Sequence, residues 1–365
     1  MADEKGGGDI LIEDTRDGFR DEYRSMNRRK AMFILAFLLL AAGAFFLTLG
    51  FGIYDIGVTD AVGVFFDHLL GNPIDPKDDY YVWDVRVPRA IGALLIGAGL
   101  SVAGAIMQND FKNPLAEPYT MGISSGAFLG ATLNIILGIS IVPFISGTAT
   151  TVVNSFICSL IPTAIIVLVA KYRNLTPTAM ILTGIAVMFL FSSITQIMMV
   201  TAPSETMADA YEWRVGSLSS MQWEYIPVML IVTVLITAVL WFSSSKLNVM
   251  YAGDRAAQTF GENARGIRVS TLVLVSVMTA VLICFTGTIG FIGLVGPHVA
   301  RIFVGSDNRY LIPASAAFGA AFVILADTLA KVSGPNGLPV GVICSMIGGP
   351  LFIWILVRQR KSAWI

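Results

Sequence analysis

The chain has 365 residues, of which 55% are hydrophobic and 13% are charged, and its formal net charge at pH 7 is −1. This balance is far more apolar than that of soluble globular domains, so it indicates an integral membrane protein. The near-zero net charge gives no sign of a nucleic-acid partner. Three cysteines, Cys158, Cys284 and Cys344, lie in apolar runs. Their number and spacing indicate neither a disulfide framework nor a metal site.

A polar tail, residues 1–30, precedes the first apolar run. It lacks the order of charged, apolar and small residues that marks a cleaved signal peptide. We therefore expect this tail to stay in the cytoplasm.

Apolar runs of about 20 residues are needed to cross a bilayer as a helix, or somewhat fewer where other helices surround them. The eighth predicted helix, residues 293–304, is too short to span alone, so protein or a water-filled cavity must surround its ends. We predict an all-α integral membrane protein with a transmembrane domain over residues 31–358 and a short cytoplasmic tail at 359–365. The ten predicted helices are 31–53, 88–109, 117–137, 149–171, 178–202, 225–243, 270–288, 293–304, 309–331 and 339–358.

The distribution of Lys and Arg predicts the orientation. With the N-terminus inside, most basic residues fall in cytoplasmic segments, as the positive-inside rule requires. The C-terminus is then cytoplasmic too. Five basic residues remain outside: Lys77, Arg86, Arg89, Arg214 and Lys331.

This orientation places residues 247–268 in the cytoplasm. They form the longest polar interruption in the second half of the chain. A connection between two helices needs only a few residues, so a stretch of this length suggests a surface that another molecule contacts.

Few residues within the predicted helices could support chemistry. Asp327 is the single carboxylate placed mid-helix, and His68 and His298 are too far apart in sequence to indicate a metal pair. The GxxxxGK[ST] phosphate loop does not occur, so we expect no ATP hydrolysis by that route within this chain. We predict neither an enzyme, nor a cofactor, nor a bound metal.

Three segments, together with EWRVGSL from Glu212, resemble the FecCD/BtuC family of ABC importer permeases. The resemblance extends from about residue 31 to 358, and the motifs occur in the family's order. The segments are RVPRAIGALLIGAGLSVAGAIMQNDFKNPLAEPYTMGISSGAFLGA from Arg86, IGFIGLVGPHVARIFVGSDNRYLIPASAAFGAAFVILADTLAK from Ile289, and LPVGVICSMIGGPLFIWIL from Leu338.

The resemblance implies a ten-helix permease subunit that works as a homodimer in the cell membrane. Permeases of this family import metal chelates such as ferric siderophores, haem or cobalamin. An extracytoplasmic binding protein delivers the chelate, and two separate ATPase subunits drive its passage. The predicted number of helices agrees with this fold.

The resemblance also assigns roles to residues at the outer ends of the helices. Arg86, Arg89 and Lys331 match positions where the family has basic residues that pair with acidic side chains of the binding protein. The alternative is that these long side chains anchor helix ends at the membrane surface.

Within the polar stretch 247–268, the resemblance implies two short helices joined at a glycine, which insert into a cleft on the ATPase. Gly253, Asp254, Ala256, Ala257 and Gly261 fit this pattern, with the alanines as a packing face and Gly261 as a reversal of the chain. The alternative is an ordinary solvated loop.

The connection 174–178 matches the region where the family narrows its pathway at the cytoplasmic side. We predict a gate at Pro177 and Thr178. The alternative is a plain helix start, because proline and threonine are both favoured there.

Two other classes stay open. A secondary transporter would need no ATPase, and a structural or signalling membrane protein would transport nothing. The long polar stretch 247–268 and the few ionisable residues within the helices argue against both. The sequence does not identify the cargo.

Overall fold

The computed structural model describes residues 7–173, 176–334 and 337–358, and every regular element in these ranges is a helix. In chain order they are α1 (Gly7–Leu49), α2 (Val58–Leu70), α3 (Pro76–Asp79), the π-helix η1 (Tyr80–Arg86), α4 (Val87–Phe111), α5 (Ile123–Ile135), α6 (Thr148–Arg173), α7 (Pro177–Thr201), α8 (Ser204–Val215), α9 (Ile226–Phe242), α10 (Ser244–Ala252), α11 (Asp254–Thr259), α12 (Ala264–Thr286), α13 (Ile292–Val304), α14 (Asn308–Val332) and α15 (Val340–Arg358).

Each of the ten predicted helices has a counterpart: α1, α4, α5, α6, α7, α9, α12, α13, α14 and α15. The predicted start of α5 at residue 117 was wrong, because the helix begins at Ile123 after Gly122, which has φ +83°. The start of α12 was also wrong. That helix extends back to Ala264, where the Asn263 side chain accepts a hydrogen bond from the Gly266 amide at 3.0 Å and caps the first turn.

Within the described residues, six helices are long and apolar enough to cross a membrane, or seven if α9 and α10, which meet at a 59° bend, are one span. The helices α5, α13 and α15 are apolar but shorter. Such short helices fit a membrane protein only where other helices or a water-filled cavity surround their ends.

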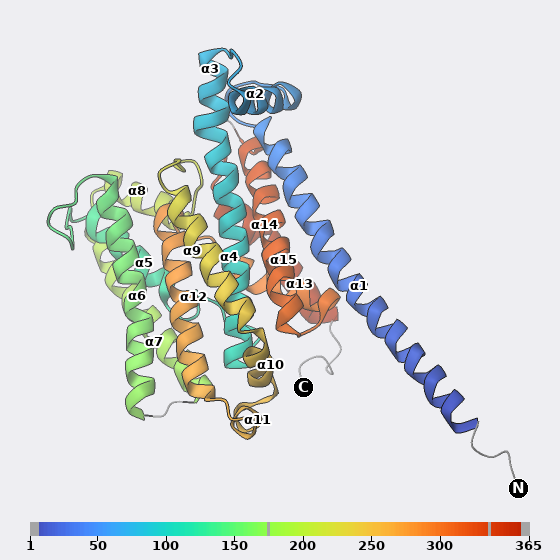
Figure 1. Ribbon diagram of the computed structural model, residues 1–365. Helices are drawn as coiled ribbons and strands as arrows, with labels where there is room; N and C mark the ends of the chain where they lie inside the picture. The colour runs from blue at the N-terminus through green and yellow to red at the C-terminus, as the bar shows by residue number, and fades with distance from the viewer. Residues whose placement is uncertain (1–6, 174–175, 335–336, 359–365) are drawn as a thin grey trace, which may run out of the picture.

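The helix α4 lies at the centre of the bundle, against α9, α12, α13 and α14 (Figure 1). Glycines allow this close packing: a Cβ atom at Gly97 would lie 2.1 Å from the Gly319 carbonyl oxygen of α14, and one at Gly104 would lie 1.7 Å from that of Gly293 on α13. Small residues of this kind let helix backbones approach in membranes. The backbone of α4 therefore packs directly against the backbones of α13 and α14.

Short elements cover the two ends of the bundle. We call the end with α2 and α3 the upper end and the end with α10 and α11 the lower end, as drawn in Figure 1. The helix α1 packs along α14 in its second half, and its first half leaves the bundle toward the lower end (Figure 1). Two non-helical breaks, residues 112–122 and 287–291, interrupt the chain between α4 and α5 and between α12 and α13.

Candidate functional site

The polar stretch predicted as a contact surface forms two short helices at the lower end. Gly253 joins α10 to α11 with φ +126° and ψ 157°, a conformation that is essentially restricted to glycine. The structure therefore contains the pair of short helices joined at a glycine that the family resemblance implied.

The two predicted alanines face different surroundings. Ala257 is fully buried against Met250 of α10 and Ala264 of α12, whereas Ala256 is partly exposed. Gly261 follows α11 in the left-handed region, at φ +77°, and no atom lies within 4 Å of the place where its Cβ would be. Gly253 is thus the joint between the helices, and Gly261 is the reversal that leads back to α12.

A buried arginine connects this segment to the membrane-spanning helices. Arg268 of α12 donates to the Asp254 carboxylate at 2.7 Å and to the Asp110 carbonyl at 2.8 Å. The Thr271 hydroxyl donates to the Asp110 carboxylate. We call Asp110, Asp254, Arg268 and Thr271 the lower-end network.

Asparagine side chains add a second connection. The Asn109 amide donates to the Leu247 carbonyl of α10 at 3.2 Å, and the Asn308 amide donates to Asn109 at 3.3 Å and to Asn248 at 2.9 Å. These contacts tie α10 to the end of α4 and the start of α14. A displacement of α10 is therefore resisted by hydrogen bonds to two central helices.

Sequence reasoning missed Asp110, Asn109 and Arg268 as members of this site. A signal was present, because Asn109 and Asp110 are adjacent polar residues at the end of a long apolar helix, where burial would require partners.

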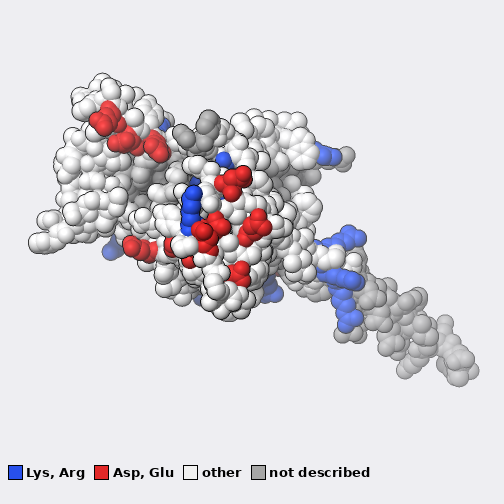
Figure 2. Space-filling model, turned by 90° about the horizontal axis from the view of Figure 1, so that it is seen from above, with Lys and Arg blue, Asp and Glu red and all other residues white. Residues whose placement is uncertain are grey.

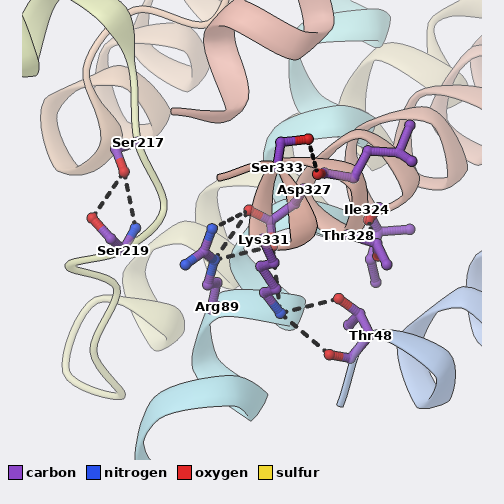
Figure 3. Close-up of polar contacts among 10 residues, drawn as sticks. Thr48, Arg89, Ser217, Ser219, Ile324, Asp327, Thr328, Lys331 and Ser333 are labelled. Atoms are coloured by element: carbon purple, nitrogen blue, oxygen red, sulfur yellow. Dashed lines mark hydrogen bonds and ion pairs between the residues drawn. The ribbon is translucent and has the colours of Figure 1, made fainter. Parts of the chain in front are cut away.

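At the upper end, Arg89, Lys331, Asp327 and Thr48 form a compact group, which we call the upper-end cluster (Figure 3). The Arg89 guanidinium binds both carboxylate oxygens of Asp327, with Nη2 to Oδ1 at 2.8 Å and Nε to each oxygen at 3.1 Å. The Lys331 ammonium lies 3.6 Å from the same carboxylate and donates to the Thr48 hydroxyl at 3.0 Å. The cluster joins α1, α4 and α14.

The cluster is largely removed from solvent. The Asp327 side chain is 0% exposed, that of Lys331 is 3% exposed and that of Arg89 is 17% exposed. Asp327, the only mid-helix carboxylate noted in the sequence, is thus a partner of two of the predicted docking residues.

The third predicted docking residue is also engaged inside the subunit. Arg86 is buried, and its guanidinium donates to the carbonyls of Leu49, at 2.6 Å, and Tyr54. It holds the chain that links α1 to α2 against the start of α4.

Acidic side chains gather on the exposed surface at this end, as Figure 2 shows in the view from above. The exposed carboxylates at this end include those of Asp55, Asp60, Asp75 and Asp84. A cation also lies there, because the Lys77 ammonium is 4.5 Å from the centre of the Tyr54 ring. These carboxylates are more exposed than the side chains of Arg86, Arg89 and Lys331.

The predicted gate residues lie at the N-terminus of α7, at the lower end. The Thr176 hydroxyl caps the helix by accepting from the Ala179 amide at 3.3 Å, Pro177 occupies its first turn, and Thr178 is exposed. The helix start is therefore present. The residues before it, 174–175, lie outside the described part of the chain.

Comparisons with known proteins match this architecture. The model of the FecCD transport family matches residues 38–358. The chain is 35% identical to the hemin transport system permease protein of Yersinia pestis, over 78% of this chain and 85% of that protein. It is 36% identical to the cobalamin import system permease protein of Halobacterium salinarum, over 77% of this chain and 74% of that protein.

A solved structure also matches the fold. It is an inward-facing conformation of a protein assigned to the metal-chelate type of ABC transporter, with a TM-score of 0.79, 25% sequence identity, and coverage of 90% of this chain and 100% of that one. The predicted family is confirmed. The chain belongs to the FecCD transport family and is a multi-pass transmembrane permease of an ABC importer.

Proposed function

We propose that this permease imports a metal chelate, such as a ferric siderophore, haem or cobalamin, across the cell membrane. In this proposal two copies form the pathway, two ATPase subunits bind the lower end from the cytoplasm, and an extracytoplasmic binding protein docks on the upper end. The observation that carries the proposal is the α10–α11 segment, two short helices anchored by hydrogen bonds to α4, α12 and α14.

The distribution of charge supports this orientation. Several basic residues lie near the lower end: Lys112, Lys171, Lys246, Arg255 and Arg265. The helix α1 also begins at this end, and α15 ends there (Figure 1). Basic residues concentrate on the cytoplasmic side of membrane proteins, so we assign the lower end and both termini to the cytoplasm.

The lower-end network supports a coupling role for Gly253, Asp254, Ala256, Ala257 and Gly261. A load on α11 reaches Asp254 first, then Arg268 of α12 and Asp110 of α4. Hydrogen bonds to charged groups contribute about 1.5–3 kcal/mol each. In this proposal the segment moves with the spanning helices instead of bending away from them.

An exposed face of α7 supports the homodimer. Ser192, Ser193 and Gln196 line a groove on this apolar helix together with Phe189 and Ile197. Polar side chains at membrane depth are favoured against protein or water and disfavoured against lipid tails. We infer that a second copy of the chain, or the pathway between the copies, covers this groove.

The gate follows from the same inference. If α7 lines the pathway, Pro177 and Thr178 at its lower end stand where the pathway meets the cytoplasm. A cysteine at Thr178 is then expected to form a disulfide with its counterpart in the second copy when ATP is absent. Failure to cross-link in any nucleotide state would place this residue away from the axis.

Docking through Arg86, Arg89 and Lys331 requires that these side chains leave their partners within the subunit. A carboxylate of the binding protein must compete with Asp327 for Arg89 and Lys331, and it must displace backbone carbonyls from Arg86. Docking through these residues would therefore depend on a rearrangement of the upper end.

Transport in proteoliposomes tests the proposed function. The permease is reconstituted with its ATPase subunits, and its binding protein is added outside with hemin, cobalamin or a ferric hydroxamate siderophore. We expect ATP-dependent uptake of at least one chelate, sensitive to vanadate and insensitive to an ionophore. Uptake that persists without ATP and stops with the ionophore would identify a secondary transporter instead.

A further inference from the structure

Four separate parts of the chain meet around one pocket of about 680 Å³. Glu117 and Tyr119 come from the break between α4 and α5, Thr288 and Phe291 from the break between α12 and α13, Arg214 from the end of α8, and Ser345 from the first turns of α15. We call it the Glu117 pocket. Its volume is within the range of about 300–1,000 Å³ that is typical of small-molecule sites.

Two polar groups in this pocket are incompletely hydrogen-bonded within the subunit. The Glu117 Oε2 atom is buried and has no donor, and the Tyr119 hydroxyl is also buried without a hydrogen bond of ordinary geometry. Burying a carboxylate oxygen or a hydroxyl without a partner is unfavourable. Because Glu117 and Tyr119 line the pocket, a ligand that draws these side chains toward it would supply the missing hydrogen bonds.

A purely structural role would explain only part of this geometry. A Cβ atom placed on Gly293 would lie 3.4 Å from Glu117 Oε2, so the carboxylate is beside the first turn of α13. The positive end of the helix dipole favours an anion there. Nevertheless, no α13 amide donates to Oε2. The helix dipole therefore favours the negative charge of Glu117, but it gives this oxygen no hydrogen-bond donor.

The backbone around the pocket supports a binding site independently. The stretches 112–122 and 287–291 are non-helical although they connect helices of the apolar bundle. Irregular backbone among apolar helices is tolerated where it is buried in protein or lines a cavity, and both stretches contribute residues to this pocket.

The pocket is also joined to the lower end of the molecule. Gln108 of α4 donates to the Gly293 carbonyl at 3.3 Å and accepts from Arg301 of α13 at 2.5 Å. Gln108 directly precedes Asn109 and Asp110, which bind α10 and Arg268. One turn of α4 therefore contacts both Gly293, which lies beside the Glu117 carboxylate, and the segment proposed to receive the ATPase.

We propose that the Glu117 pocket binds the transported chelate, and that the Glu117 carboxylate accepts a hydrogen bond from a hydroxyl, amide or ammonium group of its organic ligand. Arg214, which is exposed and lies over the Phe128 ring at 5.4 Å, offers a cation for a carboxylate of the same molecule. This inference rests on the proposed function, because it assumes that the cargo is a chelate with such groups.

Equilibrium binding to the purified full-length permease in detergent tests the inference without the ATPase. Hemin, cobalamin and a ferric hydroxamate siderophore are each titrated against the native chain, Glu117→Gln and Glu205→Gln. Glu205 is an exposed carboxylate on α8 outside the pocket. We expect at least one chelate to bind, with an affinity reduced about ten-fold in Glu117→Gln, as for loss of one charge-assisted hydrogen bond, and unchanged in Glu205→Gln.

Three results would overturn the inference: no chelate binds the native chain, Glu117→Gln binds as well as the native chain, or sodium or calcium chloride alone occupies the carboxylate and excludes the chelate. Tyr119→Phe tests the same pocket if Glu117→Gln fails to fold, because it removes one hydroxyl and keeps the ring. We expect Tyr119→Phe to weaken chelate binding about three-fold. Chelate binding that depends on Glu117 without ATP-driven uptake would refute the proposed function and leave the site intact.

Discussion

The upper-end cluster and the lower-end network both bury charged side chains, but they differ in what they join. Asp327 ties three long helices, α1, α4 and α14, to each other through Arg89 and Lys331. Arg268 of α12 instead connects the short helix α11 to α12 and α4. Its partner on α11 is Asp254, whose side chain is 41% exposed. The first arrangement connects long helices to each other, whereas the second connects them to a carboxylate that an external partner can reach.

This difference suggests that the two ends of the molecule have different roles. The buried carboxylate of Asp327 has both cations within the same subunit, so any change in it alters the folded state. Asp254 can be reached from solvent while it remains bonded to the core. We therefore expect substitutions at the upper end to lower the stability of the fold. Substitutions at the lower end are expected to reduce the coupling between ATP hydrolysis and uptake.

The largest effect is expected at Asp327. Asp327→Asn leaves Arg89 and Lys331 without their counterion, and breaking a buried ion pair typically costs about 3–5 kcal/mol. We expect a marked decrease in the thermal unfolding midpoint of the detergent-purified permease. The exposed Asp84→Asn serves as its control.

The same variant sharpens the docking hypothesis. If Arg89 and Lys331 bind the partner, their release from Asp327 is expected to strengthen the affinity of the binding protein for folded Asp327→Asn, in a salt-dependent way. Unchanged affinity at low and high salt would count against docking through these two cations.

A smaller effect is expected at Ala257. Ala257→Leu inserts a larger side chain between Met250 and Ala264, and overpacking of this kind costs about 1–3 kcal/mol. Because the cost falls on the α10–α11 segment, we expect uptake to fall while unfolding of the whole protein shifts little. Ala252→Leu, at an exposed position on α10, is the control, and equal uptake by the two variants would refute the buried packing role.

Effects of similar or smaller size are expected at Gly253 and Gly261. Gly253→Ala must adopt φ +126°, where Lys112 also approaches within 3.2 Å of the added carbon, whereas Gly261→Ala meets only open space at φ +77°. We expect a cost of about 1–3 kcal/mol for Gly253→Ala, in a region essentially restricted to glycine, and about 1–2 kcal/mol for Gly261→Ala in the left-handed region. Uptake should therefore be lower in the first variant; the reverse order would make Gly261 the critical joint.

Hydropathy and charge predicted the ten main helices because long apolar runs are a local property of the chain. The exceptions have local causes as well. Pro118 and Gly122 interrupt an apolar run and place Glu117 in a non-helical stretch, and Asn263 caps α12 earlier than the apolar pattern begins.

The partners of the site residues could not be predicted in this way. Arg89 and Asp327 are 238 positions apart, and Arg268 and Asp110 are 158 apart. No periodicity connects such pairs, because tertiary packing alone brings them together. The family resemblance identified Arg89 and Lys331 by position, and only the structure revealed that they share Asp327.

Simultaneous measurement of uptake and ATP hydrolysis tests the central claim, that the α10–α11 segment transmits the work of the ATPase through Arg268. The native complex and the complexes with Arg268→Gln and the exposed control Lys171→Gln are compared in proteoliposomes. We predict that Arg268→Gln hydrolyses ATP at a similar rate but imports several-fold less chelate per ATP, because the charge-assisted hydrogen bonds from α12 to α11 and α4 are lost. An unchanged ratio of imported chelate to hydrolysed ATP in Arg268→Gln would contradict the account.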